Sequence, residues 1–434
     1  MRLHLAVRRS LARTSVTRHR VALFLAGVAV SQPVWAQTPV RITLDQAIQL
    51  ALQHNHALRA ARTQIQQNQA QETTANLRPN PVLSADSQFV PIFNPDQFSS
   101  EELDQVQQFD IGVGYLFERG KKRQHRLQAA RDQTAVSQSQ VSDAERTLTF
   151  NVAQQYVSAL LAQSNLNLAS QDLGSFQETV NISEAQYKAG AISEGDLLKI
   201  KLQLLQFETD KSQAEVALVQ AMAGLRQLLG YDAVPADFQV DGELTYQPLS
   251  LKLEELQAKA LQLRPDLAAA KLGVTAAQSQ VELAKANGKQ DFNLAMDYSH
   301  VSGLSSASVF FNIPLPVFNR NQGEIARTRF ALTAAEQSAS AAEDQVMTDI
   351  RNAYEALHTS QKVLGLYTGG YLKQAQDSRD ISEYAYKRGA ASLLDFLDAE
   401  RSYRATELAY RQALAANMIT LEQLRQAVGT RNVP

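Results

Sequence analysis

Acidic side chains recur at the same spacing in two similar segments of the chain. The segment YKAGAISEGDLL places Asp196 six residues after Gly190. The segment YKRGAASLLDFL places Asp395 six residues after Gly389, and Asp398 follows three residues later. Carboxylates held close together favour the binding of cations and protons, because their like charges repel. The first chemistry that this pattern suggests is cation binding.

A second interpretation of these acids is structural. A serine three residues before an acid is typical of a helix N-terminus, where both side chains bind free backbone amides. Ser193 has this spacing from Asp196, and Ser392 has it from Asp395. Both interpretations stay open for these two acids. Asp398 lies one turn further on, where capping does not explain it.

No other pattern in the sequence indicates catalysis or a resident metal ion. The chain has no Gly-rich phosphate loop, no HExxH or GxSxG motif and no cysteine. His54 and His56 are two residues apart and so do not share a helix face. We therefore expect no enzyme activity, no cofactor and no metal site.

A basic run could suggest nucleic-acid binding; it comprises Lys121, Lys122, Arg123, His125 and Arg126. The chain is acidic overall, and the run follows directly after a predicted strand. Contact with lipid phosphate, or plain solvation, is therefore favoured over nucleic acid.

The first 36 residues differ from the rest of the 434-residue chain. They hold six arginines, no acid, an apolar run from Val21 to Val30 and small residues before Ala36, which is typical of a secretory signal peptide. Without them, 36 of the 42 basic residues remain against 44 acidic residues, a net charge of −8. No later run reaches the roughly 18 apolar residues of a membrane-spanning helix. Membrane insertion would therefore require a closed barrel of strands.

The chain is internally duplicated. LDQAIQLALQHNHALRAA from Leu44 matches LEELQAKALQLRPDLAAA from Leu253, and the acidic segment from Tyr187 matches the one from Tyr386. Each half reads as a short helix, a helix, two strands and two long helices. We expect a signal peptide at 1–36, a first repeat at 37–230, a linker at 231–250 and a second repeat at 251–434.

Strict alternation of apolar with small or polar residues predicts four strands. The expected strands cover about 82–90, 108–117, 291–300 and 306–315, with a polar loop at 91–107 and a shorter one at 301–305. About ten residues is the length that crosses a bilayer as a tilted strand. A small soluble sheet is the alternative, but its apolar face would need a covering layer.

Two segments without proline, Lys121 to Tyr187 and Gln322 to Tyr386, each predict one continuous helix of roughly 100 Å. The next helix in each half carries a seam of residues spaced alternately three and four apart, as in coiled coils. The first seam runs from Leu197 to Leu228. The second, from Phe396 to Ala427, is smaller and more polar, so a wet or intersubunit contact is expected there.

Four strands are too few to close a barrel, because single-chain barrels begin at about eight strands. An open sheet edge in lipid would leave backbone groups unpaired, at several kcal/mol each. We therefore expect the chain to form oligomers.

In its architecture and residues, the mature chain resembles the TolC-like outer-membrane factor family. LRPNPVLS from Leu77, FERGKKRQHR from Phe117 and PLPVFNRNQGEIARTR from Pro314 are similar to its CzcC-like branch, which serves metal-exporting resistance-nodulation-division pumps. The resemblance implies a mainly α fold with a small β part: a long coiled-coil helical barrel, and four transmembrane strands per subunit of a 12-stranded trimeric β-barrel. It also implies a homotrimer in the outer membrane of a Gram-negative bacterium, with lipid, a periplasmic adaptor and an inner-membrane pump as partners.

The resemblance places the periplasmic mouth of the duct at the two acidic segments. It implies adaptor contacts at Tyr187, Gly190, Ser193, Gly389 and Ser392, and a gate at Asp395, Asp398, Asp196 and Tyr386. With three-fold symmetry, Asp395 and Asp398 would contribute six carboxylates near the axis, and these would attract cations. The family's arginine five residues after the tyrosine is Ala391 here.

The function expected from these observations is a passive exit duct for solutes, in particular heavy-metal cations. One alternative is the same duct for organic toxins or for type I secretion of a polypeptide. Another is a soluble periplasmic coiled-coil scaffold, in which the alternating segments pack against their own helices.

Overall fold

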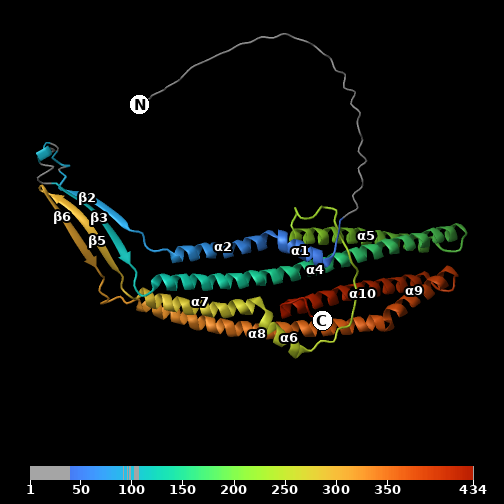
Figure 1. Ribbon diagram of the computed structural model, residues 1–434. Coiled ribbons are helices and arrows are strands. Elements are labelled where there is room, and N and C mark those ends of the chain that lie inside the picture. Colours follow the sequence, from blue (N-terminus) through green and yellow to red (C-terminus); the bar gives the residue numbers. More distant parts are fainter. Residues whose placement is uncertain (1–39, 91, 95, 97–98, 102–106, 434) are drawn as a thin grey trace, which may run out of the picture. The chain divides into compact units, whose positions relative to one another are not determined.

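The computed structural model describes residues 40–90, 92–94, 96, 99–101 and 107–433. The expected signal peptide and much of the expected 91–107 loop lie outside the described residues. The four longest strands gather at one end of the unit from Val40 onward, and the turns between the long helices lie at the opposite end (Figure 1). The first repeat contains β1 (Arg41–Ile42), α1 (Leu44–His54), α2 (His56–Asn76), β2 (Val82–Gln88), β3 (Gln108–Phe117), α4 (Lys122–Lys188) and α5 (Glu194–Leu229).

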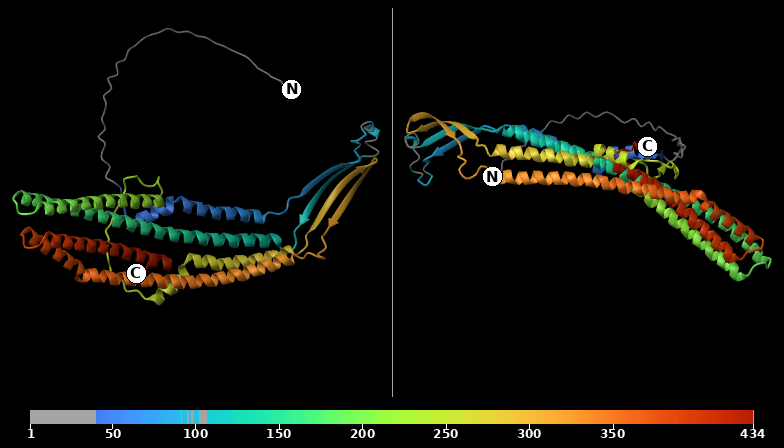
Figure 2. Two further views of the ribbon diagram at one scale, coloured as in Figure 1. Left: turned by 180° about the vertical axis from the view of Figure 1, so that it is seen from behind. Right: turned by 90° about the horizontal axis from the view of Figure 1, so that it is seen from below.

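The second half repeats this order after a short strand, β4 (Gln239–Val240). It contains α6 (Leu253–Leu263), α7 (Pro265–Asn287), β5 (Phe292–Val301), β6 (Leu304–Asn312), α8 (Gln322–Leu366), the π-helix η2 (Tyr367–Tyr371), α9 (Leu372–Lys387) and α10 (Leu393–Val428). The two views in Figure 2 show the long helices of both halves running side by side away from the strands.

The four long strands form one antiparallel sheet in the order β2-β3-β5-β6. β2 stops at Gln88 rather than at 90, because Phe89 takes a left-handed backbone with φ of 58°. The expected 301–305 loop is a turn of two residues, Ser302 and Gly303, both with positive φ, so β6 starts at Leu304. Such a turn matches the twist of a tight hairpin.

One face of this sheet is apolar and exposed. Val113 pairs with Met296, which pairs with Val309, and these side chains are 51%, 62% and 66% exposed. The neighbouring row on the opposite face holds Gly112 and Asp297. Because the apolar rows are exposed, none of the helices in the described part of the chain covers this face. The packing expected for a soluble scaffold is therefore wrong.

The first helical hairpin follows the sequence prediction closely. α4 is a single helix of 67 residues, about 100 Å long. On α5 the expected seam supplies the buried residues Leu197, Ile200, Phe207 and Leu225. Its polar position, Lys211, is partly exposed and pairs with a glutamate one turn on, at 3.4 Å.

The second hairpin departs from the prediction of one continuous helix. α8 ends at Leu366, and the wider turn η2 separates it from α9. Within η2, Gly370 has φ of 131° and ψ of −16°, outside the helical region. The pair Gly369–Gly370 therefore interrupts the helix, because only glycine adopts this backbone without strain.

The wet or intersubunit contact expected on the second seam is wrong at its most polar position. Asn417 is buried, and its Nδ2 donates to Ser360 Oγ on α8 at 2.9 Å. Thr420 Oγ1 lies 3.1 Å from the same hydroxyl. Asn417 and Thr420 are thus hydrogen-bonded within the subunit.

A contact near the middle of the rod joins the N-terminal part to the linker. β1 pairs in parallel with β4, inside the expected 231–250 linker. The hydroxyl of Tyr156 on α4 lies 2.9 Å from the Ile42 carbonyl oxygen and 2.6 Å from that of Asp241. Burial is the largest cause that raises the pKa of Tyr156 to about 12, so the hydroxyl keeps its proton.

Substitutions in η2 should have opposite effects at adjacent glycines. Gly370→Ala should lower the free energy of unfolding by about 1 to 3 kcal/mol, because an L side chain strains this backbone. Its Cβ would meet only the Gln374 amide, at 3.9 Å, so crowding contributes little. Gly369→Ala should raise the same free energy by about 0.5 to 1 kcal/mol, because alanine favours helices. Thermal unfolding followed by circular dichroism tests both; a change of the same sign in the two variants would contradict this assignment.

Candidate functional site

The two turns at the far end of the rod have the same backbone geometry. Gly190 and Gly389 have φ of 76° and 72°, and each follows the last turn of a helix. The amide after each glycine donates to a carbonyl five residues earlier, at 2.8 Å in both turns. These are glycine helix stops, so both glycines end a long helix and reverse the chain.

Ser193 and Ser392 begin the returning helices. Ser193 Oγ accepts the Asp196 amide at 3.1 Å, and Ser392 Oγ accepts the Asp395 amide at 3.2 Å. In the second turn, the carboxylate also accepts the serine backbone amide at 3.2 Å, which completes a capping box. Hydrogen bonds from the serine hydroxyl and amide lower the pKa of Asp395. Capping and charge therefore coexist at this residue.

A cleft of about 780 Å³ lies between the two turns. Of the predicted site residues, it brings together Ser193, Asp196, Tyr386, Gly389 and Ser392. The remaining predicted residues do not line it.

Asp395 and Asp398 are exposed on α10, outside the cleft lining. Tyr187 and Gly190 are likewise exposed, at the end of the first hairpin. The predicted residues thus form one shared cleft with exposed positions around it.

Tyr386 joins the cleft to a hydrophobic cluster beneath it. Its ring stacks on Phe396 with 5.3 Å between ring centroids, and Phe396 is 2% exposed. The cluster includes Phe176 of α4 and Phe207 of α5, so it binds both hairpins together. The Tyr386 hydroxyl is buried and has no hydrogen-bond partner among the described residues. Ala391, where the family has arginine, lines the same cleft.

A charged cluster that the sequence did not reveal lies further along the helices from the two turns. Arg404 of α10 donates to Asp172 of α4 at 3.0 Å and to Asp210 of α5 at 2.6 Å. Its guanidinium also lies over the Phe207 ring, 4.1 Å from the centroid. One side chain thus bridges both hairpins. Burial raises the pKa values of Asp172 and of Glu400, although nearby arginines partly oppose these shifts.

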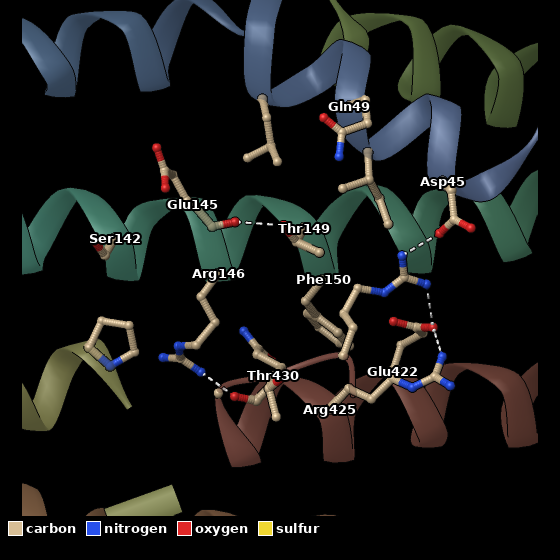
Figure 3. A pocket seen from close by; sticks show the side chains of 16 residues that line it. Asp45, Gln49, Ser142, Glu145, Arg146, Thr149, Phe150, Glu422, Arg425 and Thr430 are labelled. Atoms are coloured by element: carbon tan, nitrogen blue, oxygen red, sulfur yellow. Dashed lines mark hydrogen bonds and ion pairs between the residues drawn. The ribbon is translucent and has the colours of Figure 1, made fainter. Parts of the chain in front are cut away.

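A second cavity, of about 460 Å³, is lined mainly by residues of α1, α4 and α10 (Figure 3). Arg431 pairs with Asp45 at 2.6 Å and with Glu422 at 3.2 Å, and Arg425 pairs with Glu422 at 2.6 Å. Arg146 donates to a backbone carbonyl of α10 at 2.7 Å. These charges satisfy one another and join α1, α4 and α10. The cavity is therefore a junction between the two repeats.

Metal and membrane features were also assessed in the described part of the chain. No group of three or more His, Cys, Asp or Glu side chains there could hold a metal ion. No helix there combines the length and the apolar character needed to cross a membrane.

Comparison with known families decides what this arrangement is. The family described as "Outer membrane efflux protein" matches residues 47–231 and 256–430, which is most of the chain. The chain belongs to this family. It is therefore an outer-membrane channel protein of bacterial efflux systems, and the two matched ranges correspond to its two structural repeats.

Two relatives of this outer-membrane efflux protein have low sequence identity to it, but the matches extend over most of each chain. The cobalt-zinc-cadmium resistance protein CzcC of Cupriavidus metallidurans is 24% identical over 380 residues, 85% of each chain. The pyoverdine export outer membrane protein OpmQ of Pseudomonas putida is 24% identical over 403 residues, 86% of this chain and 83% of that protein.

A solved structure of CusC shares the fold, with a TM-score of 0.73 at 21% identity over 93% of this chain and 96% of that chain. The cation efflux system protein CusC of Escherichia coli is 27% identical over 297 residues, 65% of this chain and 64% of that protein. The prediction of the family, the fold class and the outer-membrane location is confirmed.

Removing the Arg404 bridge should loosen the two hairpins of this efflux protein. Arg404→Met leaves the Asp172 carboxylate, 9% exposed, without its partner. We expect a loss of about 2 to 3 kcal/mol in unfolding free energy, somewhat below that for a fully buried pair. Circular dichroism should record a lower midpoint of thermal unfolding. Arg401→Met is the matched control, because Arg401 is exposed and has no ion pair among the described residues; equal effects of the two changes would refute the bridge.

Proposed function

We propose that three copies of this chain form one closed duct through the outer membrane. The observation that supports this proposal is the open four-stranded sheet with an exposed apolar face. In lipid, the unpaired edges of β2 and β6 must find partners, and identical neighbours supply them. Residues 1–36 direct export of the chain and are then removed.

The helices extend this duct into the periplasm, where the two turns meet a periplasmic adaptor. The exposed positions Tyr187 and Gly190, with Ser193, Gly389 and Ser392 at the cleft, are the adaptor contacts. An inner-membrane resistance-nodulation-division pump loads the solute and supplies the energy. The duct itself performs no catalysis and holds no cofactor.

The solutes are heavy-metal cations. Two relatives support this substrate class by their names, a cobalt-zinc-cadmium resistance protein and a cation efflux system protein. OpmQ, named for pyoverdine export, supports the second candidate, an organic solute. The exposed acids at the turns favour cations, because repulsion between carboxylates is relieved by a bound cation.

Deleting the gene separates these candidates. We expect the deletion strain to lose tolerance to one or more of zinc, cobalt, cadmium, nickel and copper, and to keep its tolerance to antibiotics. Restoring the gene on a plasmid should restore growth. Loss of antibiotic tolerance alone, with metal tolerance intact, would replace the cation assignment with the organic one and leave the duct in place.

The gate of the proposed duct comprises Asp395, Asp398, Asp196 and Tyr386. Asp395 and Asp398 are both exposed, so three subunits can present six carboxylates to the axis. Tyr386 holds α9 against α10 through its stack on Phe396. Opening then requires the hairpins to separate around this contact.

Neutralising the gate should relieve block of the channel by cations. In planar bilayers, Asp395→Asn with Asp398→Asn should weaken block by a divalent or trivalent cation by about ten-fold or more, because the ring loses its charge. Hydrogen bonds from Ser392 hold the pKa of Asp395 below its ordinary value of 3.8, so this carboxylate carries its charge at pH 7, where block should be measured.

Two controls separate charge from capping in this experiment. Glu336→Gln with Glu343→Gln removes the same charge from exposed positions on α8 and should leave block unchanged. Ser392→Ala removes the cap, costs about 1 kcal/mol of helix stability and keeps both carboxylates. Block that survives the double aspartate change would remove the gate assignment.

A further inference from the structure

The strand-to-helix boundary carries an excess of positive charge that the duct does not explain. Four exposed cations lie on the three connectors that meet there: Arg119, Lys121, Lys289 and Arg320. Among the described residues, none of the four has an ion pair. The mature chain is acidic as a whole, so this group, the basic collar, is a local reversal of charge.

Contacts between the connectors hold the collar together. Asp291 accepts the Arg119 backbone amide at 2.7 Å and pairs with Lys122 at 2.6 Å, so its own charge is compensated. The Lys289 side chain lies against Gly120, where an added Cβ would be 2.7 Å from its Cδ. These contacts place connectors from both repeats in one cluster.

The third connector, between β6 and α8, adjoins the same cluster. A Cβ on Gly288 would lie 2.7 Å from the Arg320 carbonyl oxygen. Asn321 Nδ2 donates to the Ala284 carbonyl of α7 at 2.8 Å. The collar is therefore built by the fold rather than by one flexible loop.

The position of the collar relative to the membrane follows from the strands. β3 and β5 have ten residues each and β6 has nine, enough to cross the apolar layer when tilted. Arg119 comes two residues after the end of β3, and Lys289 three before the start of β5. The collar thus lies at the depth of lipid headgroups, on the side of the helices.

Apolar side chains beside the collar fit the same depth. Leu315, Val317 and Phe318 precede Arg320, and Phe318 is 90% exposed. Aromatic side chains gather at the boundary between headgroups and acyl chains. A surface that combines exposed cations with an exposed aromatic ring matches a phosphate group attached to an acyl chain.

We propose that the basic collar binds the phosphate groups of anionic phospholipids in the leaflet next to the helices. A cation near an anionic membrane surface contributes about five-fold in affinity, and salt screens it. The site selects a negatively charged headgroup such as phosphatidylglycerol over a zwitterionic one. It depends on the membrane position of the sheet and not on the solute that the duct carries.

Electron spin resonance of spin-labelled lipids tests this proposal on the mature protein reconstituted in bilayers. The wild type should bind phosphatidylglycerol at least about five times more strongly than phosphatidylcholine, which is the contribution of one cation. In about 1 M sodium chloride this preference should fall close to one. Changing all four collar residues to glutamine should abolish it at low salt, while single-channel conductance stays at the wild-type value.

The control changes four exposed basic residues of the periplasmic helices to glutamine and should keep the preference. They have no ion pair among the described residues and are Arg59, Lys259, Lys271 and Lys362. Arg119→Lys with Arg320→Lys preserves charge and should also keep it. If the collar variant does not insert into bilayers, the salt dependence of the wild-type lipid preference alone tests the proposal.

Three results would overturn the proposal. They are a preference that survives high salt, a preference retained by an inserted collar variant, and a conducting wild type with no preference. A wild type that does not enter bilayers at all overturns the proposed duct as well, so the two failures can be told apart.

Discussion

The structure depends on one constraint, which is that backbone amides and carbonyls inside a bilayer must be paired. The sheet satisfies this within itself except along β2 and β6, its two outer strands. In the duct proposed above, neighbouring copies complete those edges, and the long helices that continue from the strands follow the same circle. In that assembly, the need to close the sheet also sets how the helices of the copies are arranged.

Much of the fold could be predicted, because its elements are long and regular. Alternation located the strands, and the absence of proline located the 67-residue helix. The loop predicted at 301–305 is present but shorter, because the turn at Ser302–Gly303 takes only two residues. The strands β1 and β4 escaped prediction because they have two residues each. The interruption at Gly369–Gly370 was missed although adjacent glycines often mark a break in a helix; the sequence does not show which of them leaves the helical region.

The site was predictable in part, for a related reason. The repeat and the serine-to-acid spacing identified both turns and both caps, since these interactions are local. Which acids line the cleft depends on the rotation of α10 against its neighbours, which no local pattern fixes. Arg404 was missed because Asp172 and Asp210 lie 232 and 194 residues away in the sequence. The only sequence signal for this contact was that Arg404 adjoins the second seam, whose small and polar residues leave room for a charged side chain.

The wide turn η2 has a consequence for how the second hairpin is organised. One extra residue in a helical turn rotates all later side chains by about 100° around the axis. The angular positions of side chains along α8 therefore do not continue into α9. The orientation of Tyr386, near the end of α9, depends on this wide turn as well as on the packing of α8.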